Sequence, residues 1–247
     1  MDGQTLLLSV AFLLVALVYA AVGQAGASGY IALMGLAGFA PAIMKTTALC
    51  LNIVVAAIGT TIFLKAGRLS WRNLWPFAVL GFPFSVLGGA THLPEQVYLP
   101  IVGVILVLSA IQMGRSALRS IPSAEEKAAA PPIVAALATG AAIGFISGMT
   151  GTGGGVFLAP IILCMNWGTV RQTAATTAVY NLLNSAAALI GAYSTWGSMS
   201  RELPVWVLCV IAGGSVGAYV GSRFLPERLL RTTLSLLLLV SGLKLLL

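Results

Sequence analysis

Charged residues are scarce in this chain. Of 247 residues, 13 are Lys or Arg and 6 are Asp or Glu, which is 8% of the chain, against about a quarter in soluble domains. A water-soluble globule of this size needs a polar surface that so few charges cannot make. The scarcity therefore excludes an ordinary soluble enzyme, a disordered chain and a secreted disulfide scaffold.

Side chains that hold metals or perform catalysis are also scarce. The one histidine, His92, falls in a short loop, and the three cysteines, Cys50, Cys164 and Cys209, lie in apolar stretches without CxxC spacing. We interpret the cysteines as small buried hydrophobic residues. We predict no metal site, no cofactor, no nucleic-acid partner and no enzymatic activity, and we attribute the net charge of +7 to membrane topology.

Hydrophobic residues make up 59% of the chain, and the mean hydropathy is +1.00. The apolar segments do not alternate with polar residues, so they predict helices and not an outer-membrane barrel. The fold class is therefore an all-α polytopic membrane protein, embedded in a lipid bilayer. The first segment has no basic residue before it, and we interpret it as a retained span. The predicted segments are 4–23, 29–43, 46–64, 73–91, 97–114, 132–149, 154–166, 172–194, 204–222 and 229–247.

The two halves of the chain resemble each other. Leu93-Pro94-Glu95 recurs as Leu225-Pro226-Glu227, and a Gly-rich stretch follows the first segment of each half. The longest polar break separates them. We predict a first transmembrane repeat over 1–114, a cytoplasmic linker over 115–131 and a second transmembrane repeat over 132–247.

The loops that carry basic residues are not the equivalent ones in the two halves. Lys65, Arg68 and Arg72 follow the third segment of the first half, whereas in the second half Arg223, Arg228 and Arg231 lie near the last segment. By the positive-inside rule, equivalent loops then face opposite sides of the membrane. The pattern predicts two inverted repeats of about five helical segments each, with both termini extracytoplasmic.

Each half contains a glycine-rich break, at residues 23–29 and 148–155, followed by a short apolar segment. A segment of that length is too short to cross the bilayer. We predict broken or re-entrant helix hairpins that meet near the midplane, with the positive N-terminal ends of the short helices forming an anion site. The alternative interpretation is that the glycines only permit close helix packing.

Polar residues near these breaks are the candidate ligands. Asn181 and Asn184 share a helix face, although such amides also serve as hydrogen bonds between helices. Lys45 and Arg171 each precede a third segment and either attract an anion or anchor a helix. No acidic residue lies inside a span, which favours an anionic or neutral solute. The candidate substrate-binding residues are Gln24, Ser28, Gly29, Asn52, Thr150, Gly151, Thr152, Gly153, Gly154, Gly155, Thr177, Asn181 and Asn184, with Lys45 and Arg171 as pathway charges.

The run ISGMTGTGGGVFLAP at residues 146–160 resembles the signature of the sulfite exporter TauE/SafE family of bacterial membrane permeases. Ala175-Thr176-Thr177, Asn181 and the Leu-Pro-Glu before the last segment are similar to that family as well. The first half departs from the pattern, because Ala27-Ser28-Gly29-Tyr30 replaces the triple glycine. The resemblance implies a location in the bacterial inner membrane and transport of sulfur-containing anions.

We therefore expect a secondary transporter for a small sulfur-containing anion, such as sulfite or an organosulfonate, working by alternating access around a midplane site. In this hypothesis the backbone N–H groups of Gly153, Gly154 and Gly155 hold the anion, with Thr152 and Asn181 or Asn184 completing the site. A passive anion channel and a membrane scaffold that transports no solute are the alternatives.

Overall fold

The computed structural model describes residues 3–21, 23–65, 67, 69–118 and 130–221, and part of the C-terminal stretch from 232 to 246. These residues are helical, with short connections and no strand among them. The elements are α1 (Gly3–Ala21), α2 (Ala27–Leu36), α3 (Pro41–Lys65), α4 (Trp71–Ala90), α5 (Glu95–Leu118), α6 (Ile133–Thr150), α7 (Gly155–Cys164), α8 (Val170–Gly191), the 3-10 helix η1 (Tyr193–Ser198) and α9 (Leu203–Gly221). The prediction of an all-helical chain is confirmed.

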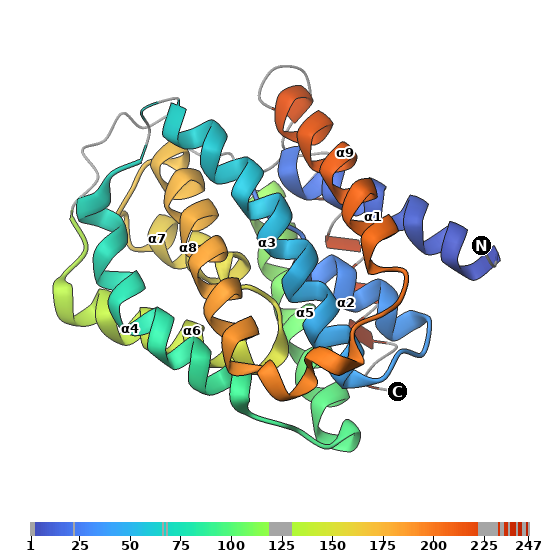
Figure 1. The fold of residues 1–247 in the computed structure, drawn as a ribbon. Helices are drawn as coiled ribbons and strands as arrows, with labels where there is room; N and C mark the ends of the chain where they lie inside the picture. Colours follow the sequence, from blue (N-terminus) through green and yellow to red (C-terminus); the bar gives the residue numbers. More distant parts are fainter. Residues whose placement is uncertain are drawn as a thin grey trace.

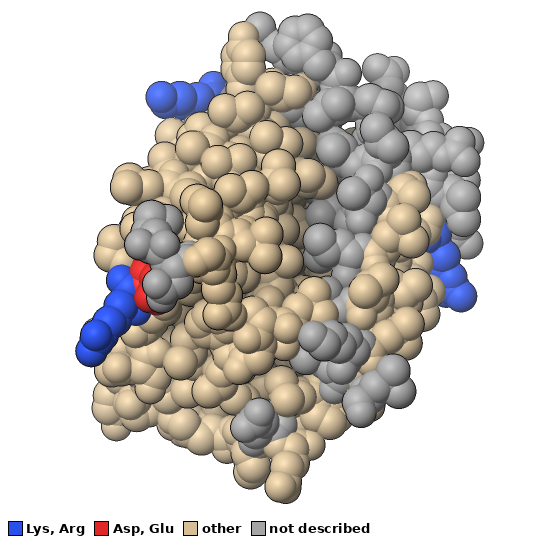
Figure 2. Space-filling model, turned by 90° about the vertical axis from the view of Figure 1, so that its right-hand side faces the viewer, with Lys and Arg blue, Asp and Glu red and all other residues tan. Residues whose placement is uncertain are grey.

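Within the described residues, five helices are long and apolar enough to cross a bilayer: α1, α3, α4, α6 and Leu203–Val220 of α9. Large apolar side chains such as Leu7, Val134 and Leu208 are exposed on their outer faces, as expected where lipid replaces water. Figure 2 shows one face of the molecule on which the few charged side chains lie at the margin of a broad neutral surface. The chain is a multi-pass membrane protein.

Two helices begin earlier than the sequence predicts. Pro41 starts α3, because proline at a first helical position needs no hydrogen-bonded N–H and already has a helical φ. Lys45 therefore lies inside α3 and does not precede it. A capping box formed by Thr169 and Gln172 starts α8 at Val170, which places Arg171 in the first turn of that helix.

The helices α3 and α8 cross the centre of the molecule, with α4 and α6 on one side and α1 and α9 on the other (Figure 1). The amide Nδ2 of Asn52 lies 2.7 Å from Ser185 Oγ, and a methyl group on Gly59 would lie 3.8 Å from the Ala178 Cβ. A later residue of α3 thus meets an earlier residue of α8, so the two helices are antiparallel.

The outer helix pairs run parallel. A methyl group on Gly144 would collide with the Gly81 backbone, and one on Gly148 would collide with Ser85. Later residues of α4 thus meet later residues of α6, so the two helices are parallel. Gly213 lies against Leu13 and Gly217 against Leu17 in the same way, so α9 and α1 are parallel. Small residues at these contacts let the backbones approach closely, as membrane helices often do.

The last described residues pack against α5 in the opposite direction. Ser235 Oγ donates to Ala110 O at 2.8 Å, whereas Gly103 lies against Leu246 and Gly242. The C-terminal stretch is therefore antiparallel to α5. Several residues that carry the sequence argument about charge and repetition lie outside the described residues: Asp2, Arg68, Arg119, Glu125, Glu126, Lys127, Arg223, Leu225, Pro226, Glu227, Arg228, Arg231 and Lys244.

Candidate functional site

The second glycine-rich break connects α6 to α7. Gly151, Gly153 and Gly154 have φ angles of +83°, +79° and +85°, which residues with a Cβ rarely adopt. The backbone can leave the helical conformation here because these positions are glycine. Residues 150–156 are all buried, so the break lies inside the protein, where non-helical backbone at membrane depth is tolerated.

Two amide side chains of α8 line this break. Asn181 Oδ1 accepts the first backbone N–H of α7, from Gly155, at 2.7 Å. Asn184 Nδ2 donates to Ser147 Oγ on α6 and approaches Gly153 O at 3.5 Å. Asn181 is 3% exposed and Asn184 is 1% exposed. The two asparagines share one helix face, as their spacing predicts. Asn184 bonds to α6 before the break, and Asn181 bonds to α7 after it.

Several backbone donors at the start of α7 have no acceptor. Among the residues that the structure describes, nothing accepts the N–H groups of Gly153, Gly154 or Val156. Such groups carry the positive end of the helix dipole. Because they are buried together at the N-terminus of a ten-residue helix, they form a region suited to an anion.

The first glycine-rich break connects α1 to α2 and repeats part of this arrangement. Gly23 and Gly26 have φ angles of +76° and +96°. Asn52 Oδ1 accepts the first N–H of α2, from Ala27, at 3.0 Å. In each half, an asparagine of the long third helix thus accepts the first N–H of the short second helix.

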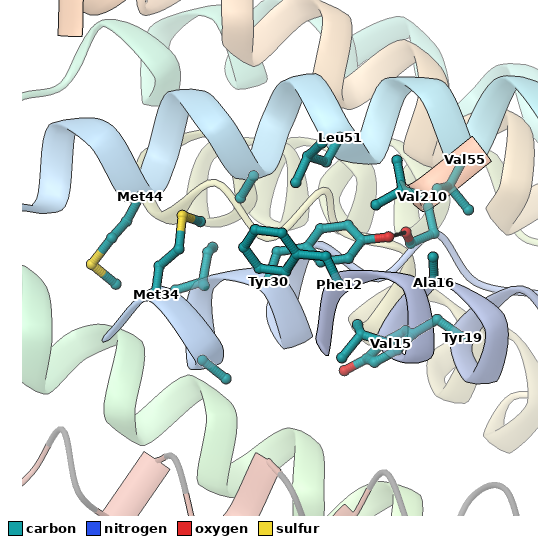
Figure 3. Close-up of a cluster of buried hydrophobic side chains, with 14 of the residues drawn as sticks. Phe12, Val15, Ala16, Tyr19, Tyr30, Met34, Met44, Leu51, Val55 and Val210 are labelled. Atoms are coloured by element: carbon teal, nitrogen blue, oxygen red, sulfur yellow. Dashed lines mark hydrogen bonds between the residues drawn. The ribbon is translucent and has the colours of Figure 1, made fainter. Parts of the chain in front are cut away.

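Aromatic side chains fill the first break. The Tyr19 and Ser28 hydroxyl oxygens lie 2.9 Å apart, and the Tyr30 hydroxyl donates to Ala25 O at 3.1 Å. A methyl group on Gly26 would lie 2.9 Å from the Tyr30 ring. Figure 3 shows Tyr30 beside Phe12 in the surrounding apolar cluster. The first break is therefore packed with protein side chains.

The polar residues of the two halves come together at Gly153. A methyl group on Gly153 would collide with Asn52 Nδ2 and would lie 3.1 Å from both Asn181 Oδ1 and Ser185 Oγ. Asn52 Nδ2 donates to Ser185 at 2.7 Å. Asn52 thus joins the first break to α8 and to the second break, with both ends of its amide hydrogen-bonded inside the protein.

Other predicted residues have different surroundings. The Thr150 and Thr152 hydroxyl oxygens lie 3.0 Å apart at the edge of the second break. Thr177 donates only to carbonyls of its own helix. Gly29 packs against Val15 and Tyr19 of α1. Gln24 is half-buried, and its Oε1 has no partner among the described residues.

Lys45 does not lie at an open mouth in this structure. Its Nζ donates to the carbonyls of Gly88 at 3.3 Å, Gly89 at 2.7 Å and Thr91 at 3.1 Å, and the residue is 6% exposed. These carbonyls form the C-terminal end of α4, where a cation is favoured. The anchoring interpretation of Lys45 fits this geometry. The side chain of Arg171 lies outside the described part of the structure.

Sequence reasoning missed three side chains around the breaks. Ser147 accepts from Asn184, Ser185 accepts from Asn52, and the Tyr98 hydroxyl donates to Thr150 O at 2.8 Å. Ser185 follows Asn181 by one helical turn, which was an available signal. Tyr98 comes from α5, and no local pattern points to its contact.

Comparison with known proteins supports the resemblance seen in the sequence. The model of the family described as "Sulfite exporter TauE/SafE" matches residues 8–245. The chain is 62% identical over 246 residues to "Probable membrane transporter protein y4hK" of Sinorhizobium fredii (strain NBRC 101917 / NGR234), and the match covers 100% of both chains. No solved structure matches the chain.

Proposed function

Because the chain belongs to the sulfite exporter TauE/SafE family, we propose that it is a secondary transporter of a small sulfur-containing anion such as sulfite or an organosulfonate. The observation that carries this proposal is the set of buried, unaccepted N–H groups at the start of α7, those of Gly153, Gly154 and Val156. Preorganised backbone donors bind an oxyanion without a cationic side chain.

The proposed donors differ from those expected from the sequence. The N–H of Gly155 is donated to Asn181, and the N–H of Gly151 to Ser147 O, so neither is free for substrate in this conformation. Val156 takes the place of Gly155 as a donor. Asn181 Nδ2 makes no hydrogen bond within the described residues and adds a side-chain donor, with the Thr152 hydroxyl at the edge of the site.

We further propose that the halves, 1–114 and 132–247, are inverted repeats joined by a linker at 115–131. The antiparallel pairing of α3 with α8, the third helices of the two halves, supports this. The antiparallel pairing of α5 with the C-terminal stretch agrees with it. In such a fold, α2 and α7 extend from the centre toward opposite faces, and the halves can rock around a fixed site.

The charge pattern favours an inner-membrane topology with both termini extracytoplasmic. Lys65 and Arg72, at the end of α3 and the start of α4, mark the cytoplasmic side in this proposal, following the positive-inside rule. A C-terminal reporter that is active only outside the cytoplasm should give a signal. Activity of a cytoplasmic reporter at that end would contradict the proposed topology.

Flux into proteoliposomes tests the proposed function. The purified protein is reconstituted into liposomes, and sulfite, methanesulfonate or thiosulfate is added to the outside in separate experiments. Protein-free liposomes are the control. We expect saturable, protein-dependent flux of at least one oxyanion, since a carrier has a limited turnover. Absence of flux for every oxyanion would contradict the proposal, and fast flux without saturation would indicate a passive channel.

A further inference from the structure

One polar atom beside the second break has no partner. Asn184 Oδ1 is buried, and no described residue donates a hydrogen bond to it. The same amide lies against the glycines, because a methyl group on Gly154 would lie 2.9 Å from Asn184 Nδ2. A carbonyl acceptor left without a donor inside a protein is unfavourable.

The orientation of the Asn184 amide is fixed by its neighbours. Ser147 Oγ donates to Gly144 O at 3.2 Å, so it accepts from Asn184. The carbonyl of Gly153 can only accept. Turning the amide over would place Oδ1 against the Gly153 carbonyl and would remove the donor to Ser147. The NH₂ group must therefore face these two partners, and Oδ1 is left for another donor.

The second break thus has several unaccepted donors beside an amide whose acceptor has no donor among the described residues. The N–H groups of Gly153, Gly154 and Val156 suit negatively charged oxygens, whereas Asn184 Oδ1 needs a hydrogen-bond donor. We infer that the site selects a monoprotonated oxyanion, which carries one negative charge and one O–H, and that the O–H donates to Asn184 Oδ1. This inference rests on the proposed function and specifies its substrate class.

The monoprotonated form also suits the membrane setting. Among the residues whose backbone the structure describes, the acidic residues are Glu95, the first residue of α5, and Glu202, just before α9. No carboxylate in the described helix interiors can carry a proton across the membrane. A proton that travels on the substrate needs no such group, and a monoanion requires less charge compensation in the protein interior than a dianion.

Two probes of equal charge and similar shape separate the inference from the proposed function. Methanesulfonate is a monoanion without an O–H, and methylphosphonate at mildly acidic pH is a monoanion with one O–H. Isothermal titration of the purified full chain measures the Kd of each. We expect methylphosphonate to bind about tenfold more tightly, as one additional hydrogen bond predicts. Equal affinities, or tighter binding of methanesulfonate, would overturn this inference and leave the anion site intact. Binding of neither probe would overturn both.

A variant pair locates the preference at Asn184. In Asn184→Ala the ratio of the two affinities should fall to about one, because the acceptor is gone. Thr61→Val is the control, since the exposed Thr61 hydroxyl on α3 donates to Ala57 O of its own helix, and it should keep the wild-type ratio. A tenfold preference that survives in Asn184→Ala would overturn the assignment. If Asn184→Ala does not fold, the comparison of the two probes on the wild-type chain still tests whether the site selects a monoprotonated oxyanion.

Discussion

The two glycine-rich breaks share a framework but differ in what surrounds them. In both, an asparagine of the long third helix accepts the first N–H of the short helix, Asn52 at Ala27 and Asn181 at Gly155. At the first break, however, Tyr19 and Tyr30 fill the space next to the glycines. The glycines of the second break are equally crowded, but mainly by asparagine side chains. The framework alone therefore does not make a binding site, and the polarity of the neighbouring side chains decides.

The asparagines show the same divergence. Asn52 uses both ends of its amide inside the protein, whereas within the described part of the chain the Asn184 acceptor and the Asn181 NH₂ have no partner. In the proposed mechanism the first break is a rigid support, and the second break binds the anion. Substitutions in the two breaks should therefore have different consequences.

The largest effect is expected for Gly153→Ala. Alanine at this position would need a φ of +79°, and its methyl group would collide with Asn52 Nδ2. The backbone of the break must therefore distort. The backbone strain alone costs about 1–2 kcal/mol. We expect oxyanion flux in proteoliposomes to fall about a hundredfold or more, because misplacing a site by about 1 Å has effects of that order.

Gly38→Ala is the matched control for this substitution. Gly38 has a φ of +79°, and no atom of the described residues lies within 4 Å of its added methyl. It therefore has the same backbone strain without a collision, and it should keep most of the flux. Equal losses of flux in the two variants would show that strain, and not the geometry of the second break, is responsible.

The next effect separates Asn181 from Asn52. Asn52→Ala removes hydrogen bonds to Ala27 and Ser185 and should lower the free energy of unfolding by about 1–3 kcal/mol. Asn181→Ala should lower stability less and weaken substrate binding more, because no described residue accepts a hydrogen bond from its NH₂. Thermal unfolding and Kd, measured on both variants, check this. A larger loss of affinity in Asn52→Ala would reverse the proposed roles.

Lys45→Met tests the anchoring role of the buried lysine. The substitution leaves the carbonyls of Gly88, Gly89 and Thr91 without their shared donor, and we expect a loss of about 1–3 kcal/mol in stability. Lys65→Met, at the exposed end of α3, should change stability by less than about 0.5 kcal/mol. A large change in substrate KM with unchanged stability in Lys45→Met would instead support a pathway charge.

The smallest effects are expected from two tyrosine hydroxyls. Tyr30→Phe removes the bond to Ala25 O in the first break, and Tyr98→Phe removes the bond to Thr150 O next to the second. Each should lower stability by about 1 kcal/mol. Only Tyr98→Phe should also reduce flux, measured in the same liposomes. Reduced flux in Tyr30→Phe alone would contradict the division between the breaks.

The segments and both breaks could be predicted because they depend on local sequence. Apolar runs, glycines and Asn181 with Asn184 on one face are visible without tertiary information, and α6 ends within a residue of its predicted boundary. The filling of the first break could not be predicted, because Tyr30 occupies it only when α1, α2 and α3 pack together. The role of Lys45 likewise depends on the end of α4, which is distant in the sequence.

The most direct test of the central claim is the sulfite affinity of two folded variants, Gly26→Ala and Gly153→Ala, measured by isothermal titration. Both glycines have a positive φ and a crowded Cβ position, beside Tyr30 and Asn52 respectively. If the anion binds at the second break, Gly26→Ala should keep a Kd close to that of the wild type, and Gly153→Ala should lose measurable binding. Loss of sulfite binding in Gly26→Ala, with binding retained in Gly153→Ala, would contradict the account.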